Sequence, residues 1–128
     1  MPKFAANLTM MFTEVDFLDR FDAAKHAGFD GVEYLFPYEY DIAILQGKLE
    51  SNGLTQILHN LPAGDWEAGE RGIACLPGRV EEFQEGVDRA IEYASALGCK
   101  QVNCLAGLKP PELSSEVLIE TLISNLKF

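Results

Sequence analysis

The sequence predicts an α/β protein in which short strands and amphipathic helices alternate along the chain. Apolar runs of strand length fall at residues 3–8, 31–34, 54–59 and 101–105. Each run is followed by apolar residues at helical spacing, which begin near residues 13, 42, 80 and 115. Strict alternation of this kind favours a parallel sheet whose strands are joined by right-handed crossovers.

Helix start and stop signals delimit the first two helices. Thr13-Glu14-Val15-Asp16 resembles a capping box with Asp in place of Glu, and it predicts the start of the first helix. Gly28 is expected to end that helix, and Asn52-Gly53 to end the second. The apolar residues between these limits are Phe17, Leu18, Phe21 and Ala24 in the first helix and Ile42, Leu45 and Leu49 in the second.

The third helix has the strongest helical pattern, and the fourth has a clear cap. Gly98 is expected to end the third helix, and Ser114 or Ser115 to cap the fourth. The predicted buried stripes are Val80, Phe83, Val87, Ala90, Ile91, Ala94 and Leu97 on the third helix and Leu118, Leu122 and Leu126 on the fourth.

Composition limits the classes of protein and partner. A chain of 128 residues that is 48% hydrophobic is long enough for one domain with a core, and we expect a single domain over residues 1–128. Its net charge of −10 argues against nucleic acid and anionic membranes as partners. The three cysteines, Cys75, Cys99 and Cys104, match no zinc spacing, which predicts buried thiols in a reduced, cytoplasmic protein.

Two parallel-sheet folds fit this order of elements: an open flavodoxin-like sheet and half of a TIM barrel. An open sheet usually carries a Gly-rich phosphate turn after its first strand, but residues 8–12 contain no glycine. Polar residues stand at or near the C-terminal ends of the strands, where a barrel gathers its chemistry: Asn7, Glu33, His59 and Asn103. Because the chain stops at Phe128 within a helical pattern, we expect the first four βα units of a (β/α)8 barrel.

A long segment without apolar periodicity, residues 59–73, follows the third strand. Loops of this length inside a compact domain are usually functional or disordered. This one carries His59, Trp66 and Arg71 among its turn residues, which is a poor composition for disorder. It is therefore the leading candidate for a functional loop.

The sequence resembles the hydroxypyruvate isomerases of the xylose isomerase-like TIM-barrel superfamily, and the resemblance runs through essentially the whole chain. The segments that carry it are Phe4-Ala5-Ala6-Asn7-Leu8, Gly31 to Tyr38, Leu58 to Trp66, Gly69-Glu70-Arg71-Gly72-Ile73-Ala74-Cys75 and Val102-Asn103-Cys104-Leu105. Members of the family are complete eight-stranded barrels, so this chain is similar to their N-terminal half.

The resemblance implies the interconversion of hydroxypyruvate and tartronate semialdehyde through an enediol. Related enzymes use two glutamates and a divalent metal, and in the family those glutamates lie on later strands. The resemblance thus places no catalytic residue and no metal ligand in this chain, and it implies that the fragment alone is inactive. A sugar or sugar-acid epimerase or isomerase of the same superfamily and a non-catalytic half-barrel are the alternatives. The expected partner is a small hydroxy-keto acid or sugar. The resemblance leaves open whether the protein forms a homo-oligomer.

The candidate substrate-binding residues are Arg71, His59, Glu33, Asn7, Asn103 and Trp66. Arg71 can hold a carboxylate with two hydrogen bonds, or pair with Glu67 or Glu70 as an ordinary loop residue. His59 can donate to a substrate oxygen, or be a hydrogen-bonded structural residue.

The remaining candidates also have structural alternatives. Glu33 can accept from a substrate hydroxyl or orient His59, although a structural role is favoured. Asn7 and Asn103 can touch substrate or satisfy backbone groups at the strand ends. Trp66 can wall the site, but anchoring of the loop is favoured. His26, in the last turn of the first helix, is assigned to the surface.

Overall fold

The computed structural model describes all residues, 1–128, and has the predicted alternation of strands and helices. Two short 3₁₀ turns, η1 and η2, lead into the first and third helices. The elements are β1 (Ala5–Asn7), η1 (Phe17–Asp19), α1 (Arg20–His26), β2 (Gly31–Glu33), α2 (Ile42–Asn52), β3 (Thr55–Asn60), η2 (Pro77–Arg79), α3 (Val80–Leu97), β4 (Val102–Asn103) and α4 (Ser115–Leu126).

The four strands form one sheet in the order β1-β2-β3-β4. β1 pairs with β2 in parallel, with Ala6 opposite Val32. β2 pairs with β3 in parallel, and the register shifts between Val32 and Glu33. Neighbours in the sheet are therefore neighbours in the sequence, as in successive βα units.

The chain divides into two compact units. The first comprises residues 1–59 and 92–102, and the second comprises residues 60–91 and 103–128. The sequence predicts one domain over residues 1–128, and this stays a prediction. None of the helices combines the length and the apolar composition that a membrane span needs.

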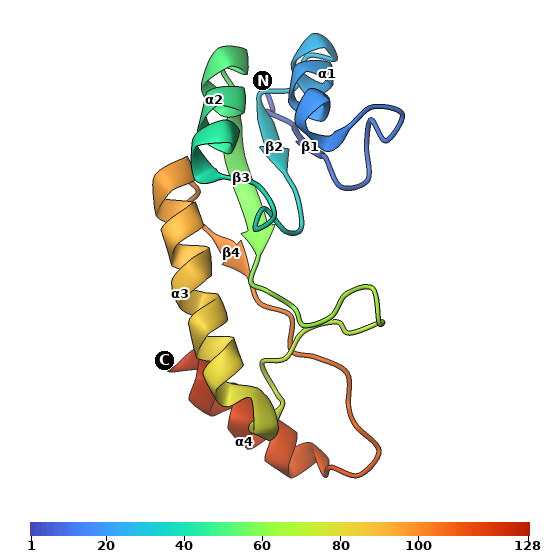
Figure 1. The fold of residues 1–128 in the computed structure, drawn as a ribbon, viewed down its shortest axis with the longest axis vertical. Helices are drawn as coiled ribbons and strands as arrows, with labels where there is room; N and C mark the ends of the chain where they lie inside the picture. Colours follow the sequence, from blue (N-terminus) through green and yellow to red (C-terminus); the bar gives the residue numbers. More distant parts are fainter. The chain divides into compact units, whose positions relative to one another are not determined.

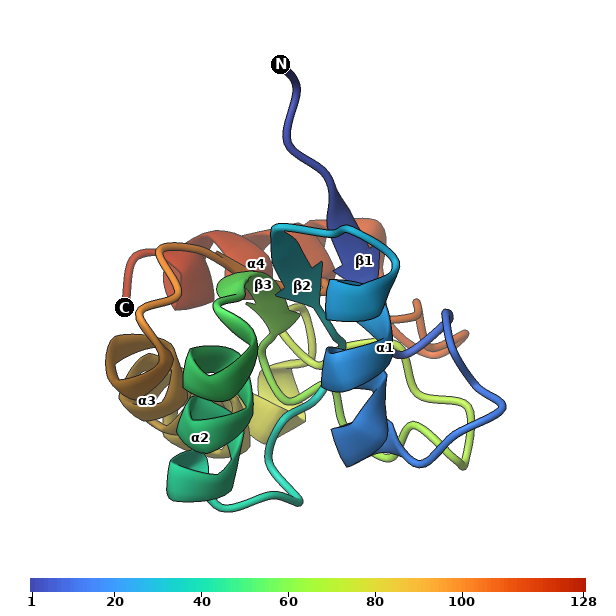
Figure 2. The same cartoon turned by 90° about the horizontal axis from the view of Figure 1, so that it is seen from above.

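The core of the first unit lies between its strands and its helices. Figures 1 and 2 show α1 and α2 on the same side of β1, β2 and β3. Phe21 of α1 and Leu45 of α2 are fully buried there, as is Val32 of β2. Phe17 stacks on Tyr40 with ring centroids 4.8 Å apart, and it meets Tyr34 edge-on at 5.3 Å. Tyr34 and Tyr40, at the two ends of the loop after β2, thus serve packing.

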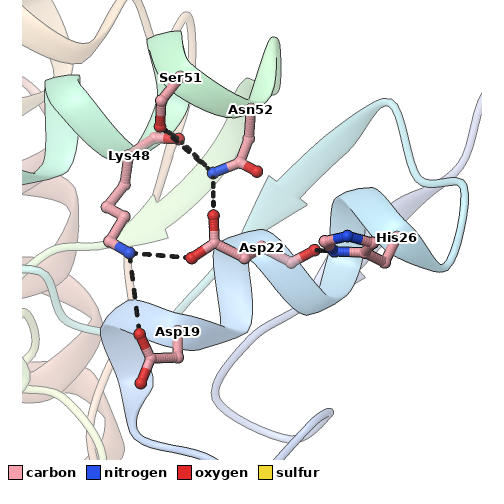
Figure 3. Close-up of polar contacts among 6 residues, drawn as sticks. All are labelled: Asp19, Asp22, His26, Lys48, Ser51 and Asn52. Atoms are coloured by element: carbon pink, nitrogen blue, oxygen red, sulfur yellow. Dashed lines mark hydrogen bonds and ion pairs between the residues drawn. The ribbon is translucent and has the colours of Figure 1, made fainter.

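A polar cluster fastens α1 to α2 on the surface of this unit (Figure 3). The Lys48 ammonium donates to an Asp22 carboxylate oxygen at 2.9 Å, and the Asn52 amide donates to the other at 2.8 Å. These two hydrogen bonds, Lys48 first, lower the pKa of Asp22 below its ordinary value. Asn52 therefore both ends α2 and links the two helices.

The predicted start of the first helix is wrong. The expected capping box at Thr13 lies in a turn region, and helical structure begins only at Phe17, with Asp16 at the N-cap. Phe12 has a positive φ of 59°, so the chain is still turning there. Arg20 then donates to the carbonyl oxygens of Val15 and Leu8, at 3.0 and 2.8 Å. Because these tertiary hydrogen bonds hold residues 8–15 as a loop, the helix starts later than its local sequence suggests.

The predicted helix ends are confirmed for α1, α2 and α3. Gly28, Gly53 and Gly98 each follow a helix with a positive φ, between 58° and 90°. A left-handed residue that ends a helix is most readily glycine, because glycine has no Cβ to clash. The sequence predicts these helix ends because the requirement for glycine depends only on the local backbone conformation.

The buried stripe of α3 differs from the predicted one. Phe83, Ala90 and Leu97 are buried as expected, but Ile91 is 54% exposed and Tyr93 is buried instead. A buried face through residues 83, 86, 90, 93 and 97 follows the helical period better than one that includes position 91. Hydropathy alone favours Ile91 over Tyr93. The Tyr93 hydroxyl is accommodated because it donates to the Tyr40 carbonyl at 2.8 Å.

In the second unit, α4 buries a polar residue that the apolar pattern does not predict. Leu118 is buried and Leu122 is half-buried, but Leu126 is 62% exposed. Asn125 is buried in its place and donates to the Ala74 carbonyl at 2.8 Å. The buried face thus runs through residues 118, 122 and 125. The backbone carbonyl of Ala74, just after the long loop, decided this, and sequence periodicity cannot reveal it.

The N-cap of α4 gives a direct test of local stability. The Ser114 hydroxyl accepts the backbone N–H of Val117. We expect Ser114→Ala to lower the free energy of unfolding of the α4 region by about 1 kcal/mol, because the N–H loses its partner. Ser115→Ala is the matched control, since the Ser115 hydroxyl contacts only Lys109 at the surface. Hydrogen exchange of the α4 amides measures both, and equal losses would contradict the capping role.

Candidate functional site

Two predicted site residues meet at the ends of β1 and β2 in the first unit. The Asn7 side-chain amide donates to a Glu33 carboxylate oxygen at 3.1 Å. The Asn7 side-chain oxygen also accepts the backbone N–H of Thr9 at 3.0 Å, and the Thr9 hydroxyl accepts the N–H of Leu35 at 2.9 Å. Asn7 and Glu33 therefore help to shape the loops that follow their own strands.

His59, near the end of β3, is fully buried and belongs to a polar chain within the same unit. Its Nδ1 lies 2.9 Å from the Gln56 amide nitrogen, and Gln56 Oε1 accepts from the Tyr34 hydroxyl. Tyr38 packs its ring edge-on against the imidazole, with centroids 6.0 Å apart. Gln56, and not Glu33, is thus the side chain of this unit that orients His59.

In the second unit, the long loop is fixed at its centre by Glu70. One Glu70 carboxylate oxygen accepts the backbone N–H of Asp65, and the other pairs with Arg79 of η2. Arg79 also holds Glu82, in the first turn of α3, with hydrogen bonds of 2.7 and 2.8 Å. The loop, η2 and the start of α3 are therefore joined through one guanidinium. Both carboxylates stay partly open to solvent, since the side chains of Glu70 and Glu82 are 34% and 51% exposed.

Arg71 lies on the same loop and stacks on Trp66. Its guanidinium carbon is 3.9 Å from the centre of the indole ring. Its Nη1 donates to the carbonyl oxygens of Trp66 and Glu70, at 3.1 and 2.6 Å. The Glu70 carboxylate pairs with Arg79, so the predicted alternative of an Arg71–Glu70 ion pair is wrong. Stacking on Trp66 thus restricts the orientation of the Arg71 guanidinium.

Gly72 sets the backbone path beside Arg71. It has a φ of +107° and forms an antiparallel bridge with Ala106. A Cβ at this position would collide with the Leu105 carbonyl oxygen. The residue must therefore be glycine, because both its dihedral angle and the close approach of the loop after β4 exclude a side chain.

Asn103, at the end of β4, joins the start of the long loop. Its side-chain amide donates to the Asn60 side-chain oxygen at 3.1 Å, and its carbonyl accepts the N–H of Leu61 at 2.9 Å. Asn60 is buried. Asn103 therefore satisfies polar groups at a strand end, which is one of its two predicted roles.

An open cavity of about 280 Å³ lies beside Arg71 in the second unit. Lys109, from the loop after β4, lines the same cavity and donates to the Ser115 hydroxyl at 2.9 Å. Two cationic side chains from separate loops, Arg71 and Lys109, thus line the same cavity. The sequence does not predict the place of Lys109 beside this cavity, because no local pattern connects it with Arg71.

The charges of the long loop predict how its order depends on pH. The hydrogen bond from Arg79, and then that from Asp65, lower the pKa of Glu70. A lowered carboxyl pKa in the folded state stabilises the fold above the ordinary pKa. That contribution is lost as the pH falls below the ordinary value and through the lowered one. Trp66 is the single tryptophan of the chain, so its fluorescence reports this loop.

We expect Trp66 emission to keep its native spectrum at neutral pH and to shift toward that of an exposed indole in acid. Glu70→Gln should show part of this shift already at neutral pH. Glu67→Gln is the matched control, because Glu67 is an exposed carboxylate of the same loop. Identical acid titrations in wild type and Glu70→Gln would show that the Glu70–Arg79 pair does not order the loop.

The structure does not offer a metal site within the chain. No group of three or more His, Cys, Asp or Glu side chains is placed to hold an ion. Asn7 engages Glu33 and Arg79 engages Glu70, so these carboxylates already have partners. These 128 residues thus present no complete set of metal ligands, and the divalent metal that the resemblance implies stays an expectation for the full-length protein.

The cysteines and His26 take the surroundings that the sequence predicts. Cys75 and Cys99 are buried and Cys104 is partly buried, and all three are free thiols. Burial raises the pKa of Cys104. His26 is exposed at the last position of α1.

Comparison with known proteins places this arrangement in a family. A family model described as xylose isomerase-like TIM barrel matches residues 21–128. The chain is 59% identical over 128 residues to the hydroxypyruvate isomerase of Escherichia coli (strain K12), and it covers 50% of that protein. It is 51% identical over 128 residues to the 2-oxo-tetronate isomerase of Pectobacterium atrosepticum, and covers 49% of it. The chain thus spans about half the length of the curated relatives it matches.

Solved structures agree. A crystal structure described as AP endonuclease, family 2, from Brucella melitensis superposes with a TM-score of 0.95 at 48% identity, covering 99% of this chain and 49% of that one. Protein SMc04130 from Sinorhizobium meliloti 1021 superposes with a TM-score of 0.72 at 17% identity, which shows the fold alone. The predicted fold class, with four βα units in one sheet, is confirmed, and the chain belongs to the xylose isomerase-like TIM barrel family.

Proposed function

We propose that this chain forms the first half of an isomerase that interconverts hydroxypyruvate and tartronate semialdehyde. The observation that carries the proposal is the 59% identity to a hydroxypyruvate isomerase over all 128 residues. The reaction moves a proton between neighbouring carbons next to a carboxylate, through an enediol. It therefore needs a carboxylate-binding group, an acid/base pair and donors to the developing enediolate oxygens.

Arg71 supplies the first of these groups in the proposal. Both of its hydrogen bonds to the chain use Nη1, which leaves the Nε–Nη2 edge of the guanidinium for a ligand. That edge binds a carboxylate with two parallel hydrogen bonds. Stacking on Trp66 restricts the guanidinium plane, so less conformational entropy is lost when the substrate binds. Lys109 adds a second positive charge at the same cavity.

The acid/base pair is proposed to lie outside these residues. Glu33 accepts from Asn7, Glu70 pairs with Arg79 and His59 Nδ1 contacts the Gln56 amide. Each of these potential bases is thus already engaged within its own unit. No step is assigned to a metal, because the chain presents no cluster of ligands for one.

A second candidate substrate has specific support. Three relatives named 2-oxo-tetronate isomerase are 48–51% identical to this chain. Hydroxypyruvate and 2-oxo-tetronate share a 2-oxo carboxylate and differ in the hydroxylated tail, so Arg71 would have the same role with either. The higher identity to the hydroxypyruvate isomerase favours the three-carbon substrate.

The test uses a chimera in which this chain replaces the matched residues of the E. coli relative. The ratio of kcat/KM for hydroxypyruvate to that for 2-oxo-tetronate is measured in the chimera and in the unaltered relative. We expect the chimera to isomerise hydroxypyruvate and to prefer it. A reversed preference would assign the chain to 2-oxo-tetronate isomerisation. A folded chimera that turns over neither substrate would overturn the proposal.

A further inference from the structure

Three buried polar side chains of the first unit form a continuous hydrogen-bonded chain. Tyr34 follows β2, and Gln56 and His59 both belong to β3. Tyr34 and Gln56 are each 2% exposed, and His59 is 0% exposed. The Tyr34 hydroxyl donates to Gln56 Oε1, and Gln56 Nε2 lies 2.9 Å from His59 Nδ1.

The Tyr34 hydroxyl fixes the direction of the two hydrogen bonds that link these side chains. Burial, and secondarily Cys99, raises the pKa of Tyr34 far above its ordinary value, so the hydroxyl keeps its proton. That proton is donated to Oε1 of Gln56. If the amide were reversed, the hydroxyl would lose its acceptor inside the core, which is costly for a buried polar group. The amide therefore turns its NH₂ group toward His59.

An amide nitrogen can only donate, so His59 Nδ1 must accept with its lone pair. A neutral imidazole whose Nδ1 accepts carries its single proton on Nε2. We propose that Tyr34 and Gln56 are positioning residues that hold His59 in the tautomer protonated at Nε2. In this state His59 is a hydrogen-bond donor through Nε2 and cannot accept a proton there. Edge-on packing of Tyr38 helps to keep the ring in place.

The consequence for catalysis rests on the proposed function. If hydroxypyruvate is isomerised, His59 acts only as a hydrogen-bond donor through Nε2 and does not abstract the proton from carbon. The tautomer itself is a property of the protein without substrate. It can therefore be measured whether or not the proposed function holds.

His26 provides an internal control with the opposite expectation. Its Nδ1 lies 2.7 Å from the Asp22 backbone carbonyl oxygen, one turn earlier on α1 (Figure 3). A carbonyl oxygen can only accept, so Nδ1 of His26 must carry a proton. The chain has two histidines, and the structure thus predicts a different tautomer for each.

The experiment is a long-range ¹H–¹⁵N correlation spectrum of the 128-residue chain with ¹⁵N-labelled histidine, recorded at mildly alkaline pH. His59→Gln assigns the two sets of signals. We expect His59 to show an unprotonated Nδ1 and a protonated Nε2, and His26 to show the reverse. A protonated Nδ1 at His59, or signals averaged between two tautomers, would overturn the proposal.

Two variants test the positioning residues separately. Gln56→Glu replaces the donor by a carboxylate that can only accept, so the His59 Nδ1 signal should move to the protonated range. Tyr34→Phe removes the group that orients the amide, so the His59 signals should move toward the average of the two tautomers. Gln101→Glu, at an exposed position of the same unit, should change neither ring. Unchanged His26 signals show that each variant is folded, and unchanged His59 signals in both folded variants would refute the positioning role.

Discussion

The 128-residue chain by itself is expected to leave hydroxypyruvate unchanged, at the rate of buffer alone. Enediol chemistry needs one group to remove a proton from carbon and another to return it at the neighbouring carbon. The carboxylates of Glu33 and Glu70 are engaged by Asn7 and Arg79. The Gln56 amide forms a hydrogen bond with Nδ1 of His59. We therefore expect the isolated chain to lack a pair of free groups for the two proton transfers.

The measurement compares the isolated chain with the chimera under identical conditions, at equal concentrations of folded protein. We expect activity in the chimera alone. Circular dichroism of the isolated chain serves as a control, because an unfolded chain would be inactive for a trivial reason. Turnover by the isolated chain at a rate close to that of the chimera would contradict the expectation. The base would then have to be sought among Glu33, His59 and Glu70.

Arg71→Ala in the chimera is expected to weaken hydroxypyruvate binding by roughly tenfold to a hundredfold, since hydrogen bonds to charged groups contribute about 1.5–3 kcal/mol. The uncharged analogue dihydroxyacetone should lose far less affinity, because it lacks the carboxylate that Arg71 binds. Arg71→Lys should recover part of the loss at most, since an ammonium cannot reproduce the planar pair of donors. Competition of each ligand against turnover gives the affinities.

Lys109→Ala is the matched control for charge, because Lys109 lines the same cavity and carries the same charge. We expect a smaller loss than for Arg71→Ala. Equal losses for the charged and the uncharged ligand in Arg71→Ala would instead make Arg71 a residue that stabilises the loop. Trp66 emission separates these outcomes, because a disordered loop would change the environment of the indole that stacks on Arg71.

The order of elements and most helix ends were predictable from sequence because they depend on local physics. The period of apolar residues distinguishes strands from helices over a few turns. Gly28, Gly53 and Gly98 mark helix ends because a left-handed residue there is most readily glycine. Ser114 caps α4 through a hydrogen bond to a residue three positions away. Each of these signals lies within a few residues of the feature that it specifies.

The polar contacts of the candidate site were not predictable in the same way. The sequence places Arg71 next to Glu70, yet it is Arg79 that binds the Glu70 carboxylate, while Arg71 stacks on Trp66. Arg71 and Arg79 carry the same charge and both lie near Glu70 in the sequence, so charge alone does not predict which of them binds its carboxylate. Only the folded loop shows which of them reaches the carboxylate, and its backbone beside Arg71 is held by the bridge between Gly72 and Ala106, 34 positions apart in the sequence.

The sequence by itself thus determined the alternation of strands and helices, the helix ends and the long loop with its candidate residues, including Arg71, Trp66 and His59. The tertiary structure alone decided that helix α1 starts at Arg20 behind a turn at η1, that Tyr93 replaces Ile91 in the buried face of α3, and that Gln56 orients His59. The physical reason is the same in each case. A polar side chain takes a hydrogen-bond partner from outside its own element, and only the folded chain brings the two together. Arg20 donates to the Leu8 carbonyl, Tyr93 to the Tyr40 carbonyl and Tyr34 to Gln56.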